Sequence, residues 1–576
     1  MKILLVAINA KYIHSNLAVY SLRAYNKDYK SQIQIVEYTI NNYSDKILEN
    51  IYKEKPDVVA FSCYIWNISM VEEVGRELKK VLPGVPIWVG GPEVSYNPRQ
   101  QMEEKPWLEG VMVGEGEETF SQLVKHYIEK KEEIWEISGL YCRKENEIID
   151  TGRRTPLSLD QIPFPYKEMK DFENKLVYYE SSRGCPYSCT YCLSSIEKGI
   201  RLRSPELVKK ELQFFIDAKV PLVKFIDRTF NANHGHAMDI WQYIYDHDEG
   251  FTNFHFEISA DLLREDEIEF VGTFRPGLIQ FEIGVQSINP TTIQAIHRKM
   301  DLNKLENAVK KVAKPGNIHQ HLDLIAGLPF EDIRSFQKSF DYVYHLAPDQ
   351  LQLGFLKVLK GSPMFEMSEE HQIAFQSIPP FEVLSTTWLS YGDVLELKKI
   401  EEMVEVYYNS GQFQNSINYM EHFFERPYAL YEALGNYYEK HGLLEVNHNR
   451  LARYSILRDF YRDRIGGERE TLDQILIFDL YLRENLKNRP EFAGIKEESK
   501  EKYQKFYRQE EKVRKLLPGY EAYNMKQISR MTHLEFFDID LMKSIQRGKR
   551  TEGESNILFD YENRNPLNHQ AAILEV

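Results

Sequence analysis

The chain of 576 residues has few cysteines, no long apolar run and no excess of positive charge. Its five cysteines, an odd and sparse number, do not make a disulfide framework, so we expect a reducing, cytoplasmic compartment. No run of about 18 apolar residues occurs, which leaves no candidate membrane span. The opening MKILLVAINA lacks a basic segment and a small-residue cleavage site, and it is typical of a buried first strand rather than a signal peptide.

The net charge of -15 is unfavourable for binding nucleic acid or an anionic membrane, and we expect neither as a partner. The composition is otherwise that of a globular protein, with 43% hydrophobic and 28% charged residues. This is enough apolar material to bury several cores. The length predicts three or four domains of roughly 150 residues each.

Residues 1–130 alternate short apolar runs with helical patterns. This alternation predicts a parallel sheet that is covered by helices on both faces. Ligands of such sheets bind beyond the carboxyl ends of the strands. The candidate binding residues that follow the third, fourth and fifth apolar runs are Ser62 and Tyr64, then Gly90 and Gly91, and finally Gly114, Glu115, Gly116 and Glu117.

The rest of the chain divides by its patterns. Residues 131–174 are predicted to be a connector with a small hairpin and a proline-rich end. Residues 175–365 contain six strand-like runs with helical stretches in nearly every gap, which predicts an open or closed barrel of βα units. Residues 366–576 show no strand pattern and predict a mostly helical domain, whose many aromatic residues indicate core packing or substrate recognition.

Three of the five cysteines lie in SSRGCPYSCTYCLSS, residues 181–195, directly after a predicted strand. Cys185, Cys189 and Cys192 have the spacing Cys-x-x-x-Cys-x-x-Cys. A disulfide would leave one thiol over, and a structural zinc site normally has four ligands. Three thiolates also suit a cubane of four irons, whose fourth iron could chelate a substrate. The residues alone leave a zinc site or a purely structural role open.

This spacing, with Tyr191 before the third cysteine, resembles that of the radical SAM superfamily. The resemblance covers residues 175–365 and implies a partial (β/α)6 TIM-type barrel. It also implies a 4Fe–4S cluster held by the three cysteines, with S-adenosyl-L-methionine bound at the open iron. Polar residues at later strand ends could each be buried structural groups, but as a series they favour a ligand: Asp227 in VKFIDRTFNAN, Glu257 in FEISADLL, and Glu282, Gln286 and Ser287 in FEIGVQSIN.

The first domain resembles a cobalamin-binding domain of the flavodoxin-like, Rossmann-like type. The resemblance implies that Ser62 and Tyr64 lie near the nucleotide tail of cobalamin. Glycine has no Cβ, so Gly90 and Gly91 would let the flat ligand approach the backbone closely. The VGEGE segment, which contains Glu115 and Glu117, recurs in cobalamin-binding radical SAM enzymes.

The chain departs from that family at the histidine that binds cobalt. The Asp-x-His-x-x-Gly pattern is absent, because Tyr12 stands in place of Asp and Leu17 in place of Gly around His14. We therefore expect no bond from His14 to cobalt. The alternative role for this histidine is a hydrogen bond near the first helix.

The C-terminal part resembles the uncharacterised domain that follows the radical SAM core in one cobalamin-dependent subgroup. Together the resemblances imply an enzyme that methylates an unactivated carbon or phosphorus centre. The alternative keeps both cofactors and changes the reaction to a rearrangement, cyclisation or oxidation. A methylthiotransferase would need further cysteines in the N-terminal domain, where only Cys63 occurs, and a non-enzymatic sensor would not need the polar strand ends. We expect a small-molecule or peptide substrate and a reducing partner such as flavodoxin or ferredoxin.

Overall fold

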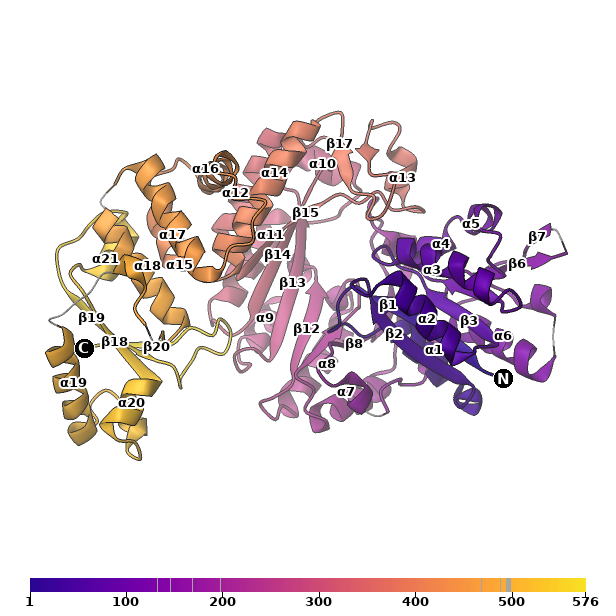
Figure 1. Cartoon of the computed structure of the whole chain (residues 1–576), viewed down its shortest axis with the longest axis horizontal. Helices are drawn as coiled ribbons and strands as arrows, with labels where there is room; N and C mark the ends of the chain where they lie inside the picture. Colours follow the sequence, from indigo (N-terminus) through magenta and orange to yellow (C-terminus); the bar gives the residue numbers. More distant parts are fainter. Residues whose placement is uncertain are drawn as a thin grey trace. The chain divides into compact units, whose positions relative to one another are not determined.

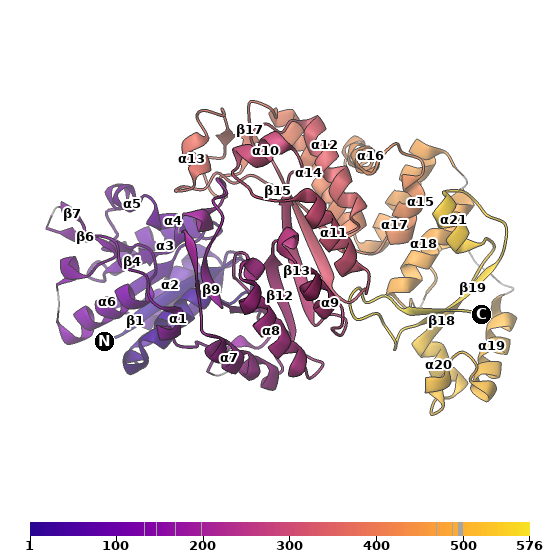
Figure 2. The same ribbon diagram turned by 180° about the vertical axis from the view of Figure 1, so that it is seen from behind.

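The fold was obtained as a computed structural model, which describes all residues except 132, 146, 168, 197, 468, 487 and 494–498 (Figures 1 and 2). The chain forms two compact units. The N-terminal unit comprises residues 1–315, 327–332 and 355–390, and the C-terminal unit comprises 316–326, 333–354 and 391–576. Across these described residues, no helix combines the length and the apolar character needed to cross a bilayer.

A seven-stranded sheet forms the first half of the N-terminal unit, in the order β2-β1-β3-β4-β5-β6-β7. The first five strands are parallel in the 2-1-3-4-5 order of flavodoxin-like sheets, which confirms the predicted fold. The strands are β1 Ile3–Asn9, β2 Ile33–Thr39, β3 Val58–Ser62, β4 Ile87–Gly90, β5 Gly110–Met112, β6 Leu140–Lys144 and β7 Glu147–Asp150.

The predicted hairpin of the connector is present as β6 and β7. It does not stand apart, because β6 pairs antiparallel with β5 and extends the N-terminal sheet. Helices cover both faces of this sheet (Figure 1). Two pairs of helices pack together, α1 Leu17–Tyr25 with α6 Glu117–Glu129 and α2 Ser44–Glu54 with α3 Ile68–Val81.

A second, six-stranded sheet has the order β15-β14-β13-β12-β11-β8 and confirms the predicted series of βα units. In β12 and β13, fully buried apolar residues alternate with half-buried and mostly polar ones, so that one face of the sheet is polar. The strands are β8 Val177–Tyr179, β11 Leu222–Phe225, β12 Asn253–Ile258, β13 Ile279–Gln286, β14 His319–Ala326 and β15 Gln350–Phe355. Helices that follow these strands in the N-terminal unit are visible in Figure 2: α7 Pro205–Asp217, α8 His234–Asp246, α9 Glu265–Val271 and α11 Leu302–Ala313.

The C-terminal unit is mostly helical, as predicted, and its aromatic residues form part of its core. Its helices include α14 Tyr391–Val404, α15 Gln414–Glu421, α16 Pro427–Lys440, α17 Arg450–Phe460, α18 Arg469–Arg483 and α21 Leu541–Arg547. The hydroxyls of Tyr407 and Tyr438, both buried, lie 2.6 Å apart. Such pairs show that aromatic side chains here serve packing.

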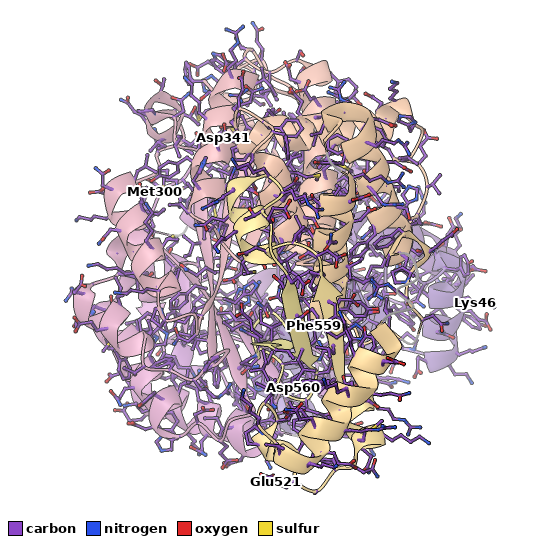
Figure 3. All side chains as sticks on the ribbon, turned by 90° about the vertical axis from the view of Figure 1, so that its left-hand side faces the viewer. Lys46, Met300, Asp341, Glu521, Phe559 and Asp560 are labelled. Atoms are coloured by element: carbon purple, nitrogen blue, oxygen red, sulfur yellow. The ribbon has the colours of Figure 1, made fainter. Side chains whose placement is uncertain are left out.

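The prediction that residues after 366 contain no strands was wrong. A three-stranded antiparallel sheet is formed by β18 Thr532–Phe537, β19 Ser555–Asp560 and β20 Ala572–Glu575. Its central strand carries Phe559 and Asp560 (Figure 3), and Asp560 accepts a 2.5 Å hydrogen bond from the Tyr520 hydroxyl. A short antiparallel pair, β16 Ala374–Phe375 and β17 Val383–Ser385, belongs to the N-terminal unit. These strands are short, and β18 does not alternate strictly, so periodicity alone did not identify them.

A buried carboxylate fixes the start of α15 in the C-terminal unit. Asp479 of α18 accepts hydrogen bonds from the backbone and side chains of Asn415 and Ser416, at 2.7 to 3.1 Å. Burial raises the pKa of Asp479 to about 6, against the opposing effect of these hydrogen bonds. An acid whose pKa is higher in the folded chain binds its proton more tightly there. Its contribution to stability is therefore greatest below about pH 4 and is lost as the pH rises through 6.

We expect the Asp479→Asn variant to lose this pH dependence. In the native chain, the free energy of unfolding contributed by Asp479 should fall by about 1 kcal/mol between pH 5 and pH 7. Urea unfolding at the two pH values, followed by circular dichroism, measures the difference between native chain and variant. Asp459→Asn, at an exposed position, is the control. Equal pH dependence in the native chain and the Asp479 variant would contradict the assignment.

Candidate functional site

The cysteine loop follows β9 Ser182–Cys185, which pairs antiparallel with β10 Gly199–Leu202. Cys185 and Cys189 are buried and Cys192 is half-buried. The loop is held on both sides: the Thr190 N–H donates to the carbonyl of Ile296 at 3.0 Å, and its carbonyl accepts from the N–H of Met364 at 2.9 Å. Backbone hydrogen bonds of this kind fix the three thiols on a rigid segment.

The thiols share one electrostatic environment. Burial raises the pKa of the Cys189 thiol, and the charges of Cys192 and Cys185 raise it further, whereas Arg298 lowers it. The Arg298 Nη1 donates to the Tyr191 hydroxyl at 3.2 Å, and its Nη2 donates to the carbonyl of Gly284. Arg298 thus places a buried positive charge beside the cysteine loop. Sequence reasoning missed this residue, which lies 107 positions after Tyr191 and in no motif.

Three cysteines on one short loop suit a cubane cluster. In the part of the chain that the structure describes, no three His, Cys, Asp or Glu side chains are grouped as ligands of one metal ion. In a cubane each thiolate binds a different iron, so the sulfur atoms need not converge on one point. The short loop, its buried thiols and the nearby guanidinium suit an anionic cluster of this kind.

Asp227, just after β11, has a structural environment. It is 1% exposed and accepts hydrogen bonds from the Ser181 N–H at 3.0 Å and from the Ser181 and Ser182 hydroxyls at 2.6 Å. Burial raises its pKa to about 6. Asp227 therefore fixes the segment between β8 and β9 that leads into the cysteine loop, and its contact with a cofactor stays a prediction.

Glu257 and Glu282 lie on the polar face of the six-stranded sheet. One Oε2 of Glu282 is 2.9 Å from both Lys224 Nζ and His255 Nε2, and Glu257 Oε2 is 3.8 Å from Arg228 Nη1. Burial opposes the charge on Glu282, but the hydrogen bond from His255 and the charge of Lys224 hold its pKa well below its ordinary value. A ligand at Glu282 would have to join an ion-paired network that already exists.

Gln286 and Ser287, at the end of β13, differ in whether their side-chain oxygens already have a hydrogen-bond partner. Ser287 is fully buried, and its hydroxyl donates to Glu331 Oε1 at 2.7 Å. Gln286 has a backbone φ of +71°, which is uncommon for a residue with a side chain, and its buried Oε1 has no hydrogen-bond partner among the described residues. Strain and an unsatisfied buried oxygen together support a ligand contact at Gln286.

In the N-terminal sheet, Ser62 and Tyr64 lie at the carboxyl end of β3, as predicted. The Ser62 hydroxyl accepts from Asn16 Nδ2 at 3.1 Å. The Tyr64 ring stacks on Trp66 with centroids 4.4 Å apart. Burial raises the pKa of Tyr64 to about 12, and the charge of Glu180, just after β8, contributes to the rise.

The predicted glycines have different roles. A Cβ on Gly91 would lie 2.4 Å from the carbonyl oxygen of Cys63, and the φ of Gly91 is +121°, so the fold itself requires this glycine. The nearest neighbour of a Cβ on Gly90 would be Met112, at an ordinary 3.4 Å. Gly114 has a φ of +81° and open space around a Cβ position, and a Cβ on Gly116 would lie 3.2 Å from Leu22.

We expect Gly90→Val to keep the sheet folded and to weaken cobalamin binding by about tenfold or more, because the added methyl groups would occupy space at the strand end. Gly91→Ala should instead destabilise the sheet. Titration with cobalamin, with circular dichroism on the same samples, separates the two effects. Native affinity in Gly90→Val would show that cobalamin does not approach this strand end closely.

His14 lies in the loop after β1 and connects the two sheets. Its Nδ1 is 2.6 Å from the Tyr178 hydroxyl of β8, and its backbone forms an isolated bridge with Leu176. Burial and the charges of Lys11 and Lys224 lower its pKa. The Nδ1 atom of His14 therefore has a protein partner, which matches the alternative role of a hydrogen bond near the first helix, and the absence of a bond from His14 to cobalt stays a prediction.

Glu115 and Glu117 have arginine partners. Glu117 Oε1 is 2.6 Å from Arg183 Nη2, Glu115 Oε2 is 3.4 Å from Arg183 Nη1, and Glu115 also pairs with Arg201. The Nε of Arg183 donates to both oxygens of Glu180 at 2.8 Å. Arg183 stands two residues before Cys185, so this network ties the last strand end of the N-terminal sheet to the cysteine loop. Direct contact of these glutamates with cobalamin stays a prediction.

Three family descriptions match consecutive parts of the chain. Residues 3–124 match the B12 binding domain, residues 179–343 match the radical SAM superfamily, and residues 369–559 match a protein of unknown function, DUF4080. The first two matches contain the two parallel sheets and the cysteine loop. The cofactors of these domains are cobalamin, S-adenosylmethionine and a 4Fe–4S cluster, in agreement with the sequence prediction.

Two curated relatives and one solved structure resemble the chain. An uncharacterized methyltransferase from Pyrococcus horikoshii is 26% identical over 70% of this chain and 85% of its own length. The cobalamin-dependent radical SAM methyltransferase TokK from Streptomyces tokunonensis is 25% identical to this chain. The match spans 56% of this chain and 50% of the length of TokK. The solved structure is that of the cobalamin-dependent S-adenosylmethionine radical enzyme OxsB with aqua-cobalamin bound. It matches 83% of this chain and 80% of OxsB at 16% identity, and the TM-score of 0.60 shows a shared fold.

Proposed function

Because the chain joins a B12-binding domain, a radical SAM domain and a DUF4080 domain in one polypeptide, we propose that this radical SAM enzyme is a cobalamin-dependent methyltransferase. Its target would be an unactivated carbon or phosphorus centre in a small molecule or a peptide. The names of the two curated relatives, both methyltransferases, support this assignment. When bound, the cluster supplies the electron that cleaves S-adenosylmethionine, and cobalamin supplies a carrier for the methyl group.

One observation carries the proposal: the two sheets meet within the N-terminal unit at the edges where their fold types bind ligands. The Arg183–Glu117 ion pair and the His14–Tyr178 hydrogen bond join these edges. In both fold types the ligand lies at the carboxyl ends of the strands. A methyl donor and a short-lived radical must be held close together and away from water, and this meeting of the strand ends supports such an arrangement.

The residues of the chain have distinct roles in this proposal. Cys185, Cys189 and Cys192 would hold the cluster, and Arg298 would offset its negative charge. Gln286, with its unpaired oxygen, would accept a hydrogen bond from bound S-adenosylmethionine. Arg183 would hold the cysteine loop against the N-terminal sheet through its ion pair with Glu117. A flavodoxin or ferredoxin would supply the electron.

The test is an anaerobic reaction of the reconstituted chain with S-adenosylmethionine labelled in its methyl group, a reductant and extract as the source of substrate. The label is expected in a product, with 5′-deoxyadenosine and S-adenosylhomocysteine formed in about equal amounts. A parallel reaction without cobalamin should give no labelled product. Unlabelled product with 5′-deoxyadenosine and no S-adenosylhomocysteine would overturn methyl transfer in favour of a rearrangement, cyclisation or oxidation.

A further inference from the structure

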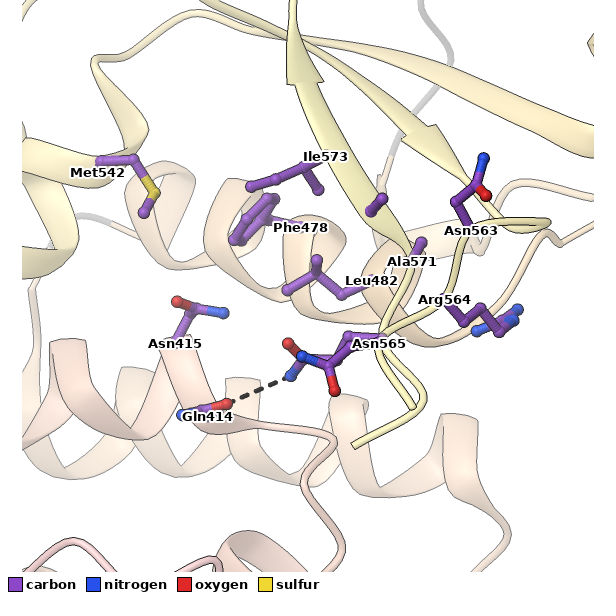
Figure 4. Close-up of a pocket in the computed structure, with 12 residues that line it drawn as sticks. Gln414, Asn415, Phe478, Leu482, Met542, Asn563, Arg564, Asn565, Ala571 and Ile573 are labelled. Carbon is purple, nitrogen blue, oxygen red and sulfur yellow. Dashed lines mark hydrogen bonds between the residues drawn. The ribbon is translucent and has the colours of Figure 1, made fainter. Parts of the chain in front are cut away.

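The C-terminal unit contains a groove with a volume of about 500 Å³, which is within the range of ligand sites (Figure 4). Two buried residues of α18, Phe478 and Leu482, form its apolar floor, and the exposed Met542 of α21 lies beside them. The remaining lining residues come from the start of α15, from residues 563–571 and from β20. The groove is far in sequence from the residues of the proposed reaction.

The groove runs along the edge of β20. Ala571, Ala572 and Ile573 all line it, although consecutive side chains of a strand point to opposite faces of the sheet. Ala571 precedes β20, and its N–H donates to the carbonyl of Leu482 at 2.7 Å, so the part of the outer edge that is left for a further strand begins at Ile573. In the strand order of this sheet, β20 is terminal, and no described strand pairs with its outer edge.

The register defines which backbone groups point to this edge. The Val576 N–H donates to the carbonyl of Asn556 at 2.9 Å, and β20 pairs antiparallel with β19. In such a ladder, backbone groups point alternately toward the partner strand and away from it. Ala572 and Leu574 therefore pair with β19, whereas Ile573 and Glu575 direct their N–H and C=O groups outward. Unpaired groups of this kind are a template for a further strand.

Amide side chains surround this edge. Each carries both donors and an acceptor, which matches the alternating groups of a peptide backbone. Gln570 Nε2 donates to Gln414 Oε1 at 3.2 Å, and Asn415 Nδ2 donates to Asp479 Oδ1 at 2.7 Å. The amides that line the groove are Gln414, Asn415, Asn563, Asn565 and Gln570.

The charged residue among those that line the groove is an arginine, Arg564, in a chain whose net charge is -15. Arg564 donates to the carbonyl of His569 at 2.6 Å, and Arg483 donates to the carbonyl of Asn568. Within the described residues, neither arginine forms an ion pair. Arg564 Nη1 donates to the backbone carbonyl of Arg483 at 3.2 Å, so the two residues are neighbours. Burial lowers the pKa of Arg483 against the raising effect of Tyr454, and the charge of Arg564 lowers it further. A negatively charged ligand would relieve their repulsion.

We propose that the groove binds an extended peptide segment with acidic side chains, which pairs with β20 as a fourth strand. The outward groups of Ile573 and Glu575 would hydrogen-bond its backbone, and alternate side chains would reach the apolar floor and Arg564. The four features above carry this inference: a strand edge that is open from Ile573 onward, an apolar floor, a group of amides and Arg564, which forms no ion pair within the described residues. It goes beyond the proposed reaction, because binding here needs neither cofactor nor turnover.

The experiment uses the full chain and two fluorescein-labelled octapeptides, (Glu-Val)4 and (Lys-Val)4, with binding followed by fluorescence anisotropy. The acidic peptide is expected to bind at least tenfold more tightly than the basic one. Arg564→Glu should weaken its binding by about tenfold. Ile573→Pro should do the same, because it removes an outward N–H while leaving the ladder to β19 intact. Arg530→Glu, at an exposed position outside the groove, is the matched control and should change the affinity by less than twofold.

Three results would overturn the proposal. Equal affinity for the two peptides would remove the charge argument. Unchanged binding in Ile573→Pro would remove the strand-pairing argument. Sedimentation showing that the native chain dimerises, that Ile573→Pro is monomeric and that neither peptide binds would assign the edge to a second copy of this chain. Circular dichroism of each variant distinguishes loss of binding from loss of folding.

Discussion

Replacing any one of Cys185, Cys189 and Cys192 by alanine is expected to abolish cleavage of S-adenosylmethionine. The anaerobically reconstituted native chain should carry about four irons and four sulfides. Each variant lacks one of three thiolates on a loop whose Thr190 backbone is held by Ile296 and Met364, and we expect no other side chain to replace the missing ligand. Iron and sulfide analysis, the visible spectrum and 5′-deoxyadenosine formation measure the loss.

Cys63 and Cys142 supply matched controls within the same chain. Both are fully buried in the N-terminal sheet, and burial raises the pKa of each thiol, to about 11 for Cys142. Neither sulfur is available as a thiolate ligand. Cys63→Ala and Cys142→Ala should therefore keep the full iron content and the cleavage activity. A complete 4Fe–4S spectrum in the triple variant of Cys185, Cys189 and Cys192 would contradict the assignment.

The parts of the site that are contiguous in sequence could be predicted from it. The cysteine loop is a local pattern, and the parallel strands are short, fully apolar runs such as ILLVAI in β1. The glycine pair at the end of β4, Gly90 and Gly91, was also predicted to lie at the ligand-binding edge of the sheet. Only the structure separates its members: Gly91 is required because its backbone packs against that of Cys63, whereas Gly90 has room for a side chain.

The contacts that assemble the site could not be predicted, because they join residues far apart in the chain. Glu117 and Arg183 are 66 positions apart, and nothing in VGEGE indicates an arginine partner in the cysteine motif. Arg298 likewise contacts Tyr191 from the segment between the helix Pro290–Ala295 and α11. At Asp227, by contrast, the sequence predicted a contact for which the structure shows a different set of partners. Its position after a strand predicted a ligand contact, and the structure shows hydrogen bonds to Ser181 and Ser182.

The C-terminal sheet was missed for a different reason. Strands β19 and β20 are separated by the loop of residues 561–571, and β20 has only four residues. Strands this short give no periodic signal over a useful window. Their identity depends on antiparallel pairing and on packing against α18, where Phe478 lies 5.8 Å from Phe559 between ring centroids. The proposed peptide groove is formed in part by this sheet, so it could not be predicted from a sequence in which the sheet was not recognised.

The second large effect is expected at Arg183. This guanidinium is 17% exposed and pairs with Glu117, which is 6% exposed, and with Glu180. Burial works against the charge on Glu117, yet Arg183 holds its pKa below the ordinary value, whereas burial raises the pKa of Glu180 to about 7 despite Arg183. Arg183→Met would leave the buried carboxylate of Glu117 and the half-buried carboxylate of Glu180 without their cation. Loss of one partner from a buried pair costs about 3–5 kcal/mol.

We therefore expect Arg183→Met to lower the free energy of unfolding of the N-terminal unit by about that amount. At temperatures where it stays folded, it should form 5′-deoxyadenosine without a matching amount of S-adenosylhomocysteine, because the cysteine loop is no longer tied to the N-terminal sheet. Arg201→Met is the matched control. Arg201 is 32% exposed and pairs with Glu115, so its loss should lower the free energy of unfolding by about 1 kcal/mol or less. The Arg201 variant should still form 5′-deoxyadenosine and S-adenosylhomocysteine in about equal amounts. If the two variants behave alike in urea unfolding and in product ratio, Arg183 does not couple the sheets.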